Sequence, residues 1–176
     1  MKAVLAVAHP DDCVIFGWPI VKAHPEWDWK IVYLTYTRDD PRGREAARFW
    51  DKQNIPTVFL GFEDHYRDLE QGYISTFDTK LASGILKNNL VNTDVIVTHN
   101  ADGDYGHIHH KFVNNVADEM DAPKIYFAGH ENNNLEIKDQ PTFDISQWPL
   151  HEDVIVGFED RAIGRYYVSE EACRYI

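Results

Sequence analysis

The sequence has little cysteine, little positive charge and no long hydrophobic run. Its 176 residues include 2 cysteines and 17 Lys and Arg against 29 Asp and Glu, for a formal net charge of −12. Two cysteines exclude a small fold held by several disulfides, and no apolar run reaches the roughly 20 residues of a membrane-spanning helix. The negative charge would repel a phosphate backbone. We therefore expect a cytoplasmic protein that binds a small molecule and neither nucleic acid nor a membrane.

The composition is that of one folded domain. Hydrophobic residues make up 44% of the chain and aromatic residues 13%. At this length roughly 70% of the unfolded surface can be buried, which excludes the disordered and fibrous classes. We expect a single domain over residues 1–176.

Apolar runs alternate with helical patterns along the chain. The first run, Lys2–Ala8, is almost continuously apolar, as is typical of a strand buried on both faces of a parallel sheet. Further strands are predicted at 29–37, 57–61, 94–99, 124–128 and 154–158, and helices at 12–23, 42–54, 75–90 and 107–119. Gly17 and Pro19 should kink the first of these helices. This order predicts an α/β fold: a Rossmann-like, doubly wound, mainly parallel sheet with helices on both faces.

Residues 131–153 interrupt this alternation. The segment is long and polar, with three consecutive asparagines at 132–134 and Pro141. Loops of this length in compact domains are often functional. Two interpretations remain open: the segment forms one wall of a substrate site, or it is a surface excursion without a role.

Two clusters of polar residues follow predicted strands, at the edge where such sheets bind ligands. His9 and Asp12 stand three positions apart after the first strand, and Gly106-His107-Ile108-His109-His110 opens the helix predicted at 107–119. His9, Asp12 and one histidine of the second cluster would supply three N and O ligands, as in catalytic zinc sites. Asp11 could then act as the general base on a metal-activated water. Alternatively, Asp11 or Asp12 caps the helix that follows.

These residues resemble the PIG-L/LmbE-like zinc-dependent deacetylases, which remove acetyl groups from N-acetylglucosaminyl conjugates and related amides. The resemblance is carried by Ala8-His9-Pro10-Asp11-Asp12 and by the Gly-His-x-x-His sequence at 106–110, with further matches at Arg44-Glu45 and Phe59-Leu60-Gly61. It covers residues 2 to about 117, and its two paired motifs are specific when taken together.

The resemblance implies a role for each matching residue. The metal ligands would be His9, Asp12 and His110, and Asp11 would be the general base. His107 would support the oxyanion or protonate the leaving amine. The sugar would be bound by Arg44 and by one acidic residue, either Asp64 or Asp68. The implied cofactor is Zn²⁺, with Fe²⁺ or another divalent metal as alternatives, and the implied substrate is an N-acetylglucosamine-type sugar or conjugate.

The chain also departs from the family pattern. Cys13 replaces a common Glu and His109 replaces a common Asp, so the hydrogen bonds around the metal should differ, and the Cys13 thiol is either sensitive to oxidation or a small buried apolar group. A histidine-containing helix motif that often closes the family pattern is not evident. We therefore expect a smaller substrate pocket, or one completed by another subunit of a homo-oligomer.

These departures motivate a second functional hypothesis. The chain would be a catalytically silent, metal-containing Rossmann-like domain that binds a glycan or a nucleotide sugar. A plain nucleotide-binding domain is disfavoured, because the turn after the first strand has two carboxylates where a phosphate site has a glycine-rich cradle.

Overall fold

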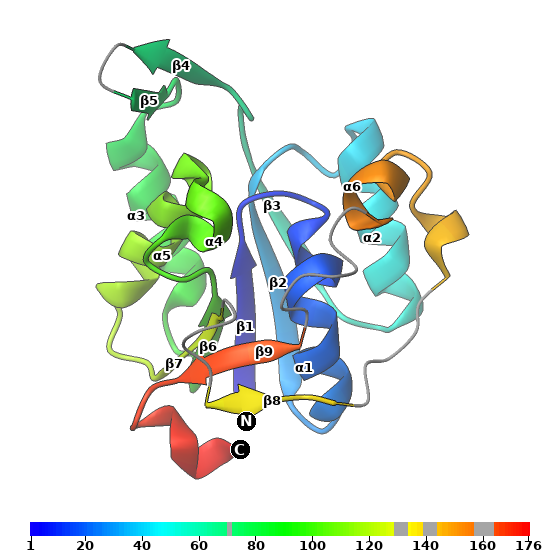
Figure 1. The fold of residues 1–176 in the computed structure, drawn as a ribbon, viewed down its shortest axis with the longest axis vertical. Helices are drawn as coiled ribbons and strands as arrows, with labels where there is room; N and C mark the ends of the chain where they lie inside the picture. Colours follow the sequence, from blue (N-terminus) through cyan, green and yellow to red (C-terminus); the bar gives the residue numbers. More distant parts are fainter. Residues whose placement is uncertain (70–71, 129–133, 139–143, 157–163) are drawn as a thin grey trace.

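The protein is built around one seven-stranded sheet, seen here in a computed structural model that describes residues 1–69, 72–128, 134–138, 144–156 and 164–176. The strand order is β3-β2-β1-β6-β7-β9-β8 (Figure 1). The strands are β1 (Lys2–Val7), β2 (Asp28–Thr35), β3 (Thr57–Phe62), β6 (Val95–Thr98), β7 (Lys124–Phe127), β8 (Leu135–Glu136) and β9 (Arg165–Val168). The five strands from β3 to β7 in this order are parallel, whereas β9 pairs antiparallel with β7 and β8 pairs antiparallel with β9. The predicted mainly parallel α/β sheet is confirmed.

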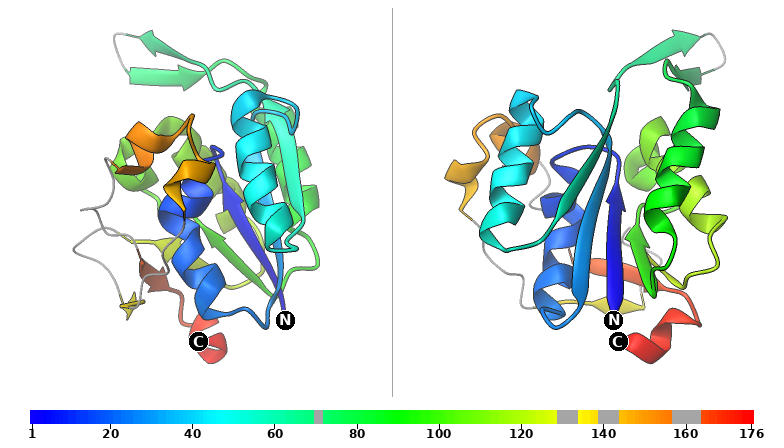
Figure 2. Two further views of the ribbon diagram at one scale, coloured as in Figure 1. Left: turned by 90° about the vertical axis from the view of Figure 1, so that its right-hand side faces the viewer. Right: turned by 180° about the vertical axis from the view of Figure 1, so that it is seen from behind.

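Helices cover both faces of this sheet, as the alternation predicted (Figure 2). One face is covered by α1 (Trp18–Ala23) and α2 (Pro41–Lys52), and the other by α3 (Thr79–Leu90) and α5 (Ile108–Asp118). Alternate residues of β1 enter the two cores: Leu5 packs in the core with Trp50, and Ala6 in the core with Leu86. The continuous apolar run of β1 is therefore explained by burial on both sides.

The first predicted helix is kinked, as Gly17 and Pro19 suggested. Its first part is the π-helical turn Cys13–Gly17, which continues into α1. A Cβ atom on Gly17 would lie 2.4 Å from a methyl carbon of Leu5, so this helix approaches the sheet more closely than a side chain would allow. Of the two expected cap residues, Asp12 occupies the N-cap position. Its side chain does not cap the helix, because Oδ2 accepts the backbone N–H of His9 instead.

The region after residue 130 differs most from the prediction. Residues Glu152–Val156 form the helix α6 rather than a strand, and residues 157–158 of that predicted strand lie outside the described residues. Glu152 and Asp153 favour a helix because acidic side chains in a first turn complement the helix dipole. The strand that pairs with β7 is instead β9, with the register Tyr126 to Tyr167.

A hairpin that the sequence did not predict extends beyond the carboxyl end of the sheet (Figure 2). It consists of β4 (Tyr66–Leu69) and β5 (Gly72–Ser75), which pair antiparallel. The helix predicted from 75 begins only at Thr79, because Asp78 accepts the backbone N–H groups of Lys80 and Leu81 as its N-cap.

Three short helices complete the described part of the chain: α4 (Gly103–Gly106) and the 3₁₀ turns Ile145–Gln147 and Ala172–Tyr175. None of the helices in the described ranges is both long enough and apolar enough to cross a membrane.

Candidate metal centre and active site

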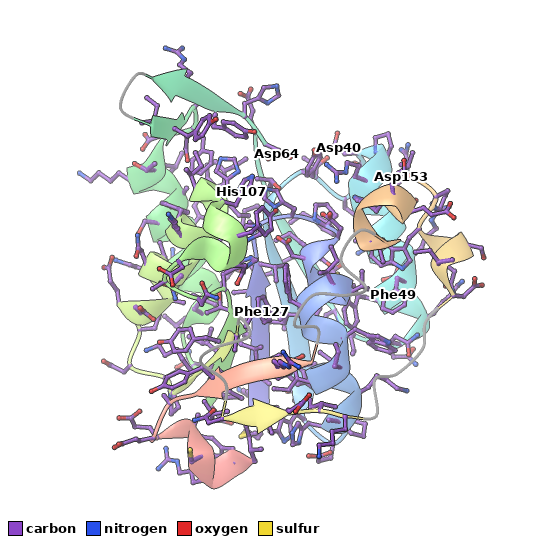
Figure 3. The ribbon with its side chains drawn as sticks, viewed as in Figure 1. Asp40, Phe49, Asp64, His107, Phe127 and Asp153 are labelled. Atoms are coloured by element: carbon purple, nitrogen blue, oxygen red, sulfur yellow. The ribbon has the colours of Figure 1, made fainter. Side chains whose placement is uncertain are left out.

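The two polar clusters meet at the carboxyl end of the sheet. His9 and Asp12 follow β1, and His110 lies in the first turn of α5, which follows β6 and α4. Strands β1 and β6 are hydrogen-bonded neighbours, so the chain leaves the sheet at adjacent points after each. Figure 3 shows the resulting gathering of side chains around the labelled Asp64 and His107. His9, Asp12 and His110 are buried.

His9, Asp12 and His110 present three donor atoms to one point. His9 Nδ1 lies 3.2 Å from Asp12 Oδ2 and 3.1 Å from His110 Nε2, and His110 Nε2 lies 3.3 Å from Asp12 Oδ2. A tetrahedral zinc site with bonds of 2.0–2.1 Å has ligand atoms about 3.3 Å apart. The spacing therefore fits a divalent cation with one position left open.

The His110 ring is held by a carboxylate on its far side. His110 Nδ1 lies 2.8 Å from Asp104 Oδ2, so its Nε2 lone pair is directed at His9 and Asp12. A carboxylate behind a histidine ligand fixes its tautomer and raises its basicity. Asp104 has a positive φ of 63°, a conformation that Asp tolerates better than most residues. Asp104 lies outside both sequence motifs and was not predicted, although its position six residues before His110 could have indicated it.

His99 supports the same carboxylate and is not a further ligand. Its Nε2 accepts the backbone N–H of Ala8 at 3.0 Å, so Nδ1 carries the proton and donates to Asp104. The donor set His99, Asp104 and His110 is therefore a hydrogen-bonded support behind the first site.

The electrostatics of the cluster favour a cation. Burial would lower the pKa of His9, but Asp12 and Asp64 raise it to about 9. Burial would raise the pKa of Asp12, yet His110 and His9 hold it well below its usual range. Without a metal, the raised pKa of His9 keeps a proton, and with it a positive charge, among these buried groups. A divalent cation can take the place of that proton.

Asp11 lies beside the three donors with the properties of a base. Burial and the neighbouring Asp12 raise its pKa. Its Oδ1 has no hydrogen-bond partner among the described residues and lies 3.7 Å from a guanidinium nitrogen of Arg42. A buried carboxylate of raised pKa is suited to accept a proton near neutral pH.

His107 is neutral and presents a proton donor. It is the N-cap of α5, where its Nδ1 accepts the backbone N–H of His109 at 3.2 Å. Burial, followed by the nearby His9 and His110, lowers its pKa to about 3. With Nδ1 used as an acceptor, the proton of the neutral ring is on Nε2. The ring centroid lies 4.6 Å from that of His9.

The structure brings Arg42, not Arg44, to this cluster. Arg44 donates to the backbone carbonyl of Asp39 on the exposed side of α2. Arg42 Nη1 instead donates to Tyr36 Oη at 2.9 Å and lies 3.8 Å from Asp64 Oδ2. Residues two positions apart on a helix face in nearly opposite directions, so the choice between these arginines depended on the orientation of α2.

The excursion at 131–153 reaches the site through His151. Arg42 Nε donates to His151 Nε2 at 2.7 Å, and His151 Nδ1 is hydrogen-bonded to Glu45. The other oxygen of Glu45 accepts the backbone N–H of Leu150 at 2.8 Å. Glu45 and His151 are both buried, so this described end of the excursion supports the site. Sequence reasoning missed His151 because it stands outside both motifs.

Of the two candidate acidic residues, Asp64 lies in the cluster. Its Oδ1 is 3.1 Å from His9 Nε2, and its Oδ2 accepts a hydrogen bond from Tyr36 Oη at 3.0 Å. Burial would raise the pKa of Asp64, but the His109 and His9 rings hold it well below its usual range. Asp68 lies in β4, opposite Tyr73, and its side chain lies outside the described part of the chain.

Cys13 is a buried structural residue. Its thiol donates to the carbonyl of Pro10 at 3.0 Å and accepts hydrogen bonds from Tyr33 and Trp50. Burial raises the pKa of this thiol, so the reactive thiolate is suppressed. Of the two expectations for Cys13, the small buried group describes it.

The comparisons with known sequences give one distant relative. No protein-family model matches the chain. Uncharacterized protein L374 of Acanthamoeba polyphaga mimivirus is 25% identical over an alignment of 148 residues, and the match covers 75% of this chain. The match spans 63% of the length of that curated relative.

Solved structures share the fold at low sequence identity. An N,N′-diacetylchitobiose deacetylase from Pyrococcus horikoshii superposes with a TM-score of 0.57 at 13% identity, over 99% of this chain and 85% of its own. A deacetylase of teicoplanin biosynthesis superposes with a TM-score of 0.56 at 10% identity, over 90% and 86%.

A third structure with this fold has a different activity. GalB from Pseudomonas putida, a 4-carboxy-2-hydroxymuconate hydratase, superposes with a TM-score of 0.56 at 15% identity, over 91% of this chain and 79% of its own. The fold implied by the family resemblance is thereby confirmed. Because both deacetylases and a hydratase share it, the reaction must be argued from the site.

Proposed function

We propose that this chain is a metal-dependent deacetylase of the PIG-L/LmbE-like type, which hydrolyses the acetamide of an N-acetylated amino sugar or its conjugate. The observation that carries the proposal is the triangle of His9, Asp12 and His110 donor atoms, 3.1–3.3 Å apart, with the carboxylate of Asp11 beside it. The fold shared with two deacetylases supports the proposal.

His9 Nδ1, one oxygen of Asp12 and His110 Nε2 would hold the cation. These nitrogen and oxygen donors suit Zn²⁺ and also Fe²⁺ or another divalent metal. When bound, the cation would lower the pKa of the attacking water and polarise the acetyl carbonyl. Asp104 and His99 keep the His110 lone pair directed at the site.

Asp11 is the proposed general base. Its raised pKa suits proton transfer at neutral pH, and it accepts the proton of the attacking water. The same carboxyl group then holds a proton that it can return to the departing amine. Arg42, 3.7 Å from Asp11, favours the ionised form of the carboxylate between turnovers.

His107 is the proposed hydrogen-bond donor to the oxyanion. The resemblance left two roles open for it, oxyanion support and protonation of the leaving amine. A pKa lowered to about 3 keeps the ring neutral, and a neutral ring with its proton on Nε2 donates a hydrogen bond more readily than it gives up a proton. The first role is therefore favoured.

The substrate hydroxyl groups would be bound on the side formed by Tyr36, Arg42 and Asp64, whose polar atoms are linked by hydrogen bonds. In this proposal Arg42 takes the role that the resemblance implied for Arg44. The amino-sugar class follows from the resemblance and agrees with the diacetylchitobiose substrate in the name of one structural neighbour.

Acetate release tests the proposal directly. The zinc-loaded chain is incubated with N-acetylglucosamine and with N,N′-diacetylchitobiose, and acetate and free amine are measured together. Equal amounts of both products are expected from the wild type, and release slower by about 10²- to 10⁴-fold from Asp11→Asn, which should keep the metal.

The same experiment separates the alternatives. Tight binding of either sugar by the metal-loaded chain without acetate or amine would favour the silent glycan-binding domain. Acetate release that persists at the wild-type rate in Asp11→Asn would remove Asp11 as the base.

A further inference from the structure

A second set of donor atoms lies on the other side of the His9 ring. His9 Nδ1 is directed at Asp12 and His110, whereas its Nε2 lies 3.1 Å from Asp64 Oδ1. His109 Nδ1 lies 3.4 Å from the same oxygen of Asp64. Donor atoms of His9, Asp64, His107 and His109 all fall within 4.8 Å of one another, and Figure 3 labels Asp64 and His107 in this group.

His109 is a buried polar side chain without a hydrogen bond. Its side chain is 0% exposed, and neither ring nitrogen has a hydrogen-bond partner among the described residues. His9 Nε2 is unpartnered in the same sense. Leaving buried polar atoms unpaired is costly, and such atoms in a native fold call for an unseen water, an ion or a functional role.

A direct hydrogen bond from His109 to Asp64 does not account for this arrangement. The 3.4 Å approach lacks the alignment of a hydrogen bond, and so does the 3.1 Å approach of His9 Nε2 to the same oxygen. Two ring nitrogens that approach one carboxylate oxygen at 3.1 and 3.4 Å without hydrogen-bond alignment resemble an ion site. Their separations bracket the spacing of about 3.3 Å in a tetrahedral zinc site.

We propose that Asp64 Oδ1, His109 Nδ1 and His9 Nε2 bind a second divalent cation of the zinc type. When both of its nitrogens coordinate, His9 releases its remaining ring proton to solvent and bridges the two cations as an imidazolate. Water completes the coordination. Tyr36 donates to the other oxygen of Asp64, which orients that carboxylate.

His107 is not a ligand of this second cation. Its Nδ1 accepts the backbone N–H of His109, so Nε2 carries the proton and has no lone pair to offer. The site therefore leaves the N-cap of α5 intact. It requires metal binding alone and stands independently of the proposed hydrolysis.

Filling the second site should regulate the first. Asp64 belongs to the side proposed to bind substrate, and a cation on Asp64 removes that carboxylate from the sugar. Excess zinc should therefore inhibit acetate release, and the inhibition should disappear in a His109 variant that still binds one cation.

Metal stoichiometry tests the second site without relying on activity. The full chain is dialysed against graded concentrations of Zn²⁺ and the metal per chain is measured. The wild type should bind two cations in two steps, with the second step weaker. His109→Leu should bind one, and the matched control His65→Leu, which removes an exposed histidine next to Asp64, should bind two.

Two results would overturn the proposal: a wild type that saturates at one cation per chain, or a His109→Leu protein that binds the second cation as the wild type does. Should His109→Leu fail to fold, Asp64→Asn serves the same comparison, because it removes a different ligand of the same site.

Cobalt substitution tests the shared ligand. Two Co²⁺ ions bridged by the His9 imidazolate should show magnetic coupling, so the electron paramagnetic resonance signal should fall below twice that of the one-cobalt form. Two independent cobalt signals would contradict His9 as the bridge. Absence of acetate release with both cations bound and coupled would count against the proposed function and leave the second site standing.

Discussion

The two sides of the candidate site are held in place in different ways. On the metal side, His9, Asp12 and His110 come from segments that directly follow β1 and from the start of α5 after β6. On the arginine side, Arg42 comes from α2 and is held by His151, which lies 109 positions away in the sequence.

The two sides therefore depend on distant parts of the chain to different extents. The metal side is formed where the neighbouring parallel strands β1 and β6 end at the same edge of the sheet. This arrangement is a consequence of the βαβ order itself. The arginine side forms only when α6 and the segment before it pack beside α2. Variants on the two sides should therefore separate metal content from substrate affinity.

His110→Ala should have the largest effect, because it removes a ligand from the metal side. We expect the chain to lose the metal and acetate release together, by a factor larger than the roughly 10- to 100-fold that follows loss of an outer hydrogen-bond partner. Metal per chain after dialysis measures this, with His65→Ala as the control. A full metal complement in His110→Ala would refute the ligand assignment.

Asp11→Asn should lower turnover while leaving the metal in place. Removing a general base typically reduces the rate by about 10²- to 10⁴-fold, and Asp11 supplies none of the three donor atoms. The measurement is kcat for acetate release at equal metal content. A variant that lost the metal as well would show that Asp11 belongs to the ligand set.

Asp104→Asn should weaken metal binding without abolishing it. Loss of the carboxylate behind His110 should reduce the metal affinity by about 10- to 100-fold. Asn also tolerates the positive φ at this position, so the backbone is preserved. Asp102→Asn, an exposed neighbour, is the control, and competition with a chelator measures the affinity; equal affinity in both variants would show that Asp104 does not tune the metal.

His151→Phe should act on the arginine side alone. Loss of the hydrogen bond to Arg42 should raise KM by about 2- to 10-fold, the equivalent of roughly 0.5–1.5 kcal/mol, with unchanged metal content. His151→Gln should restore much of the affinity, because the Gln amide can accept from Arg42 and donate to Glu45. If Phe and Gln had equal effects, the hydrogen bonds of His151 would not be what positions Arg42.

Arg44→Ala should have the smallest effect. Arg44 lies on the exposed side of α2, and surface substitutions usually change stability by less than about 0.5 kcal/mol. Its KM should match the wild type, whereas Arg42→Ala should raise KM. Steady-state kinetics on both variants distinguishes the two arginines, and the opposite ranking would restore Arg44 as the substrate contact.

The parts of the fold that the sequence predicted correctly share one property. The strands at 2–8, 29–37, 57–61, 94–99 and 124–128 alternate with helices and carry apolar runs, which are strong signals both in the buried strands β1, β2 and β6 and in the partly buried strands β3 and β7. The strands β4, β5 and β9 carry mixed polar and aromatic residues and gave no such signal; six of their ten residues whose burial is described are exposed. The apolar run at 154–156 is helical. Three residues are too few to distinguish the periodicity of a helix from that of a strand.

The order of apolar runs and polar clusters was enough to predict the parallel sheet and the meeting of His9 and Asp12 with the cluster at 106–110, because a chain that leaves adjacent parallel strands must emerge at the same edge. The choice of His110 within that cluster came from the family resemblance. The net negative charge also follows directly from the sequence. Three features of the site could not be predicted from the sequence: Arg42 rather than Arg44 faces the site, Asp104 and His151 support it, and His109 is buried beside Asp64. These outcomes depend on the rotation of helices about their axes and on contacts between distant segments, which side-chain packing sets and local sequence does not.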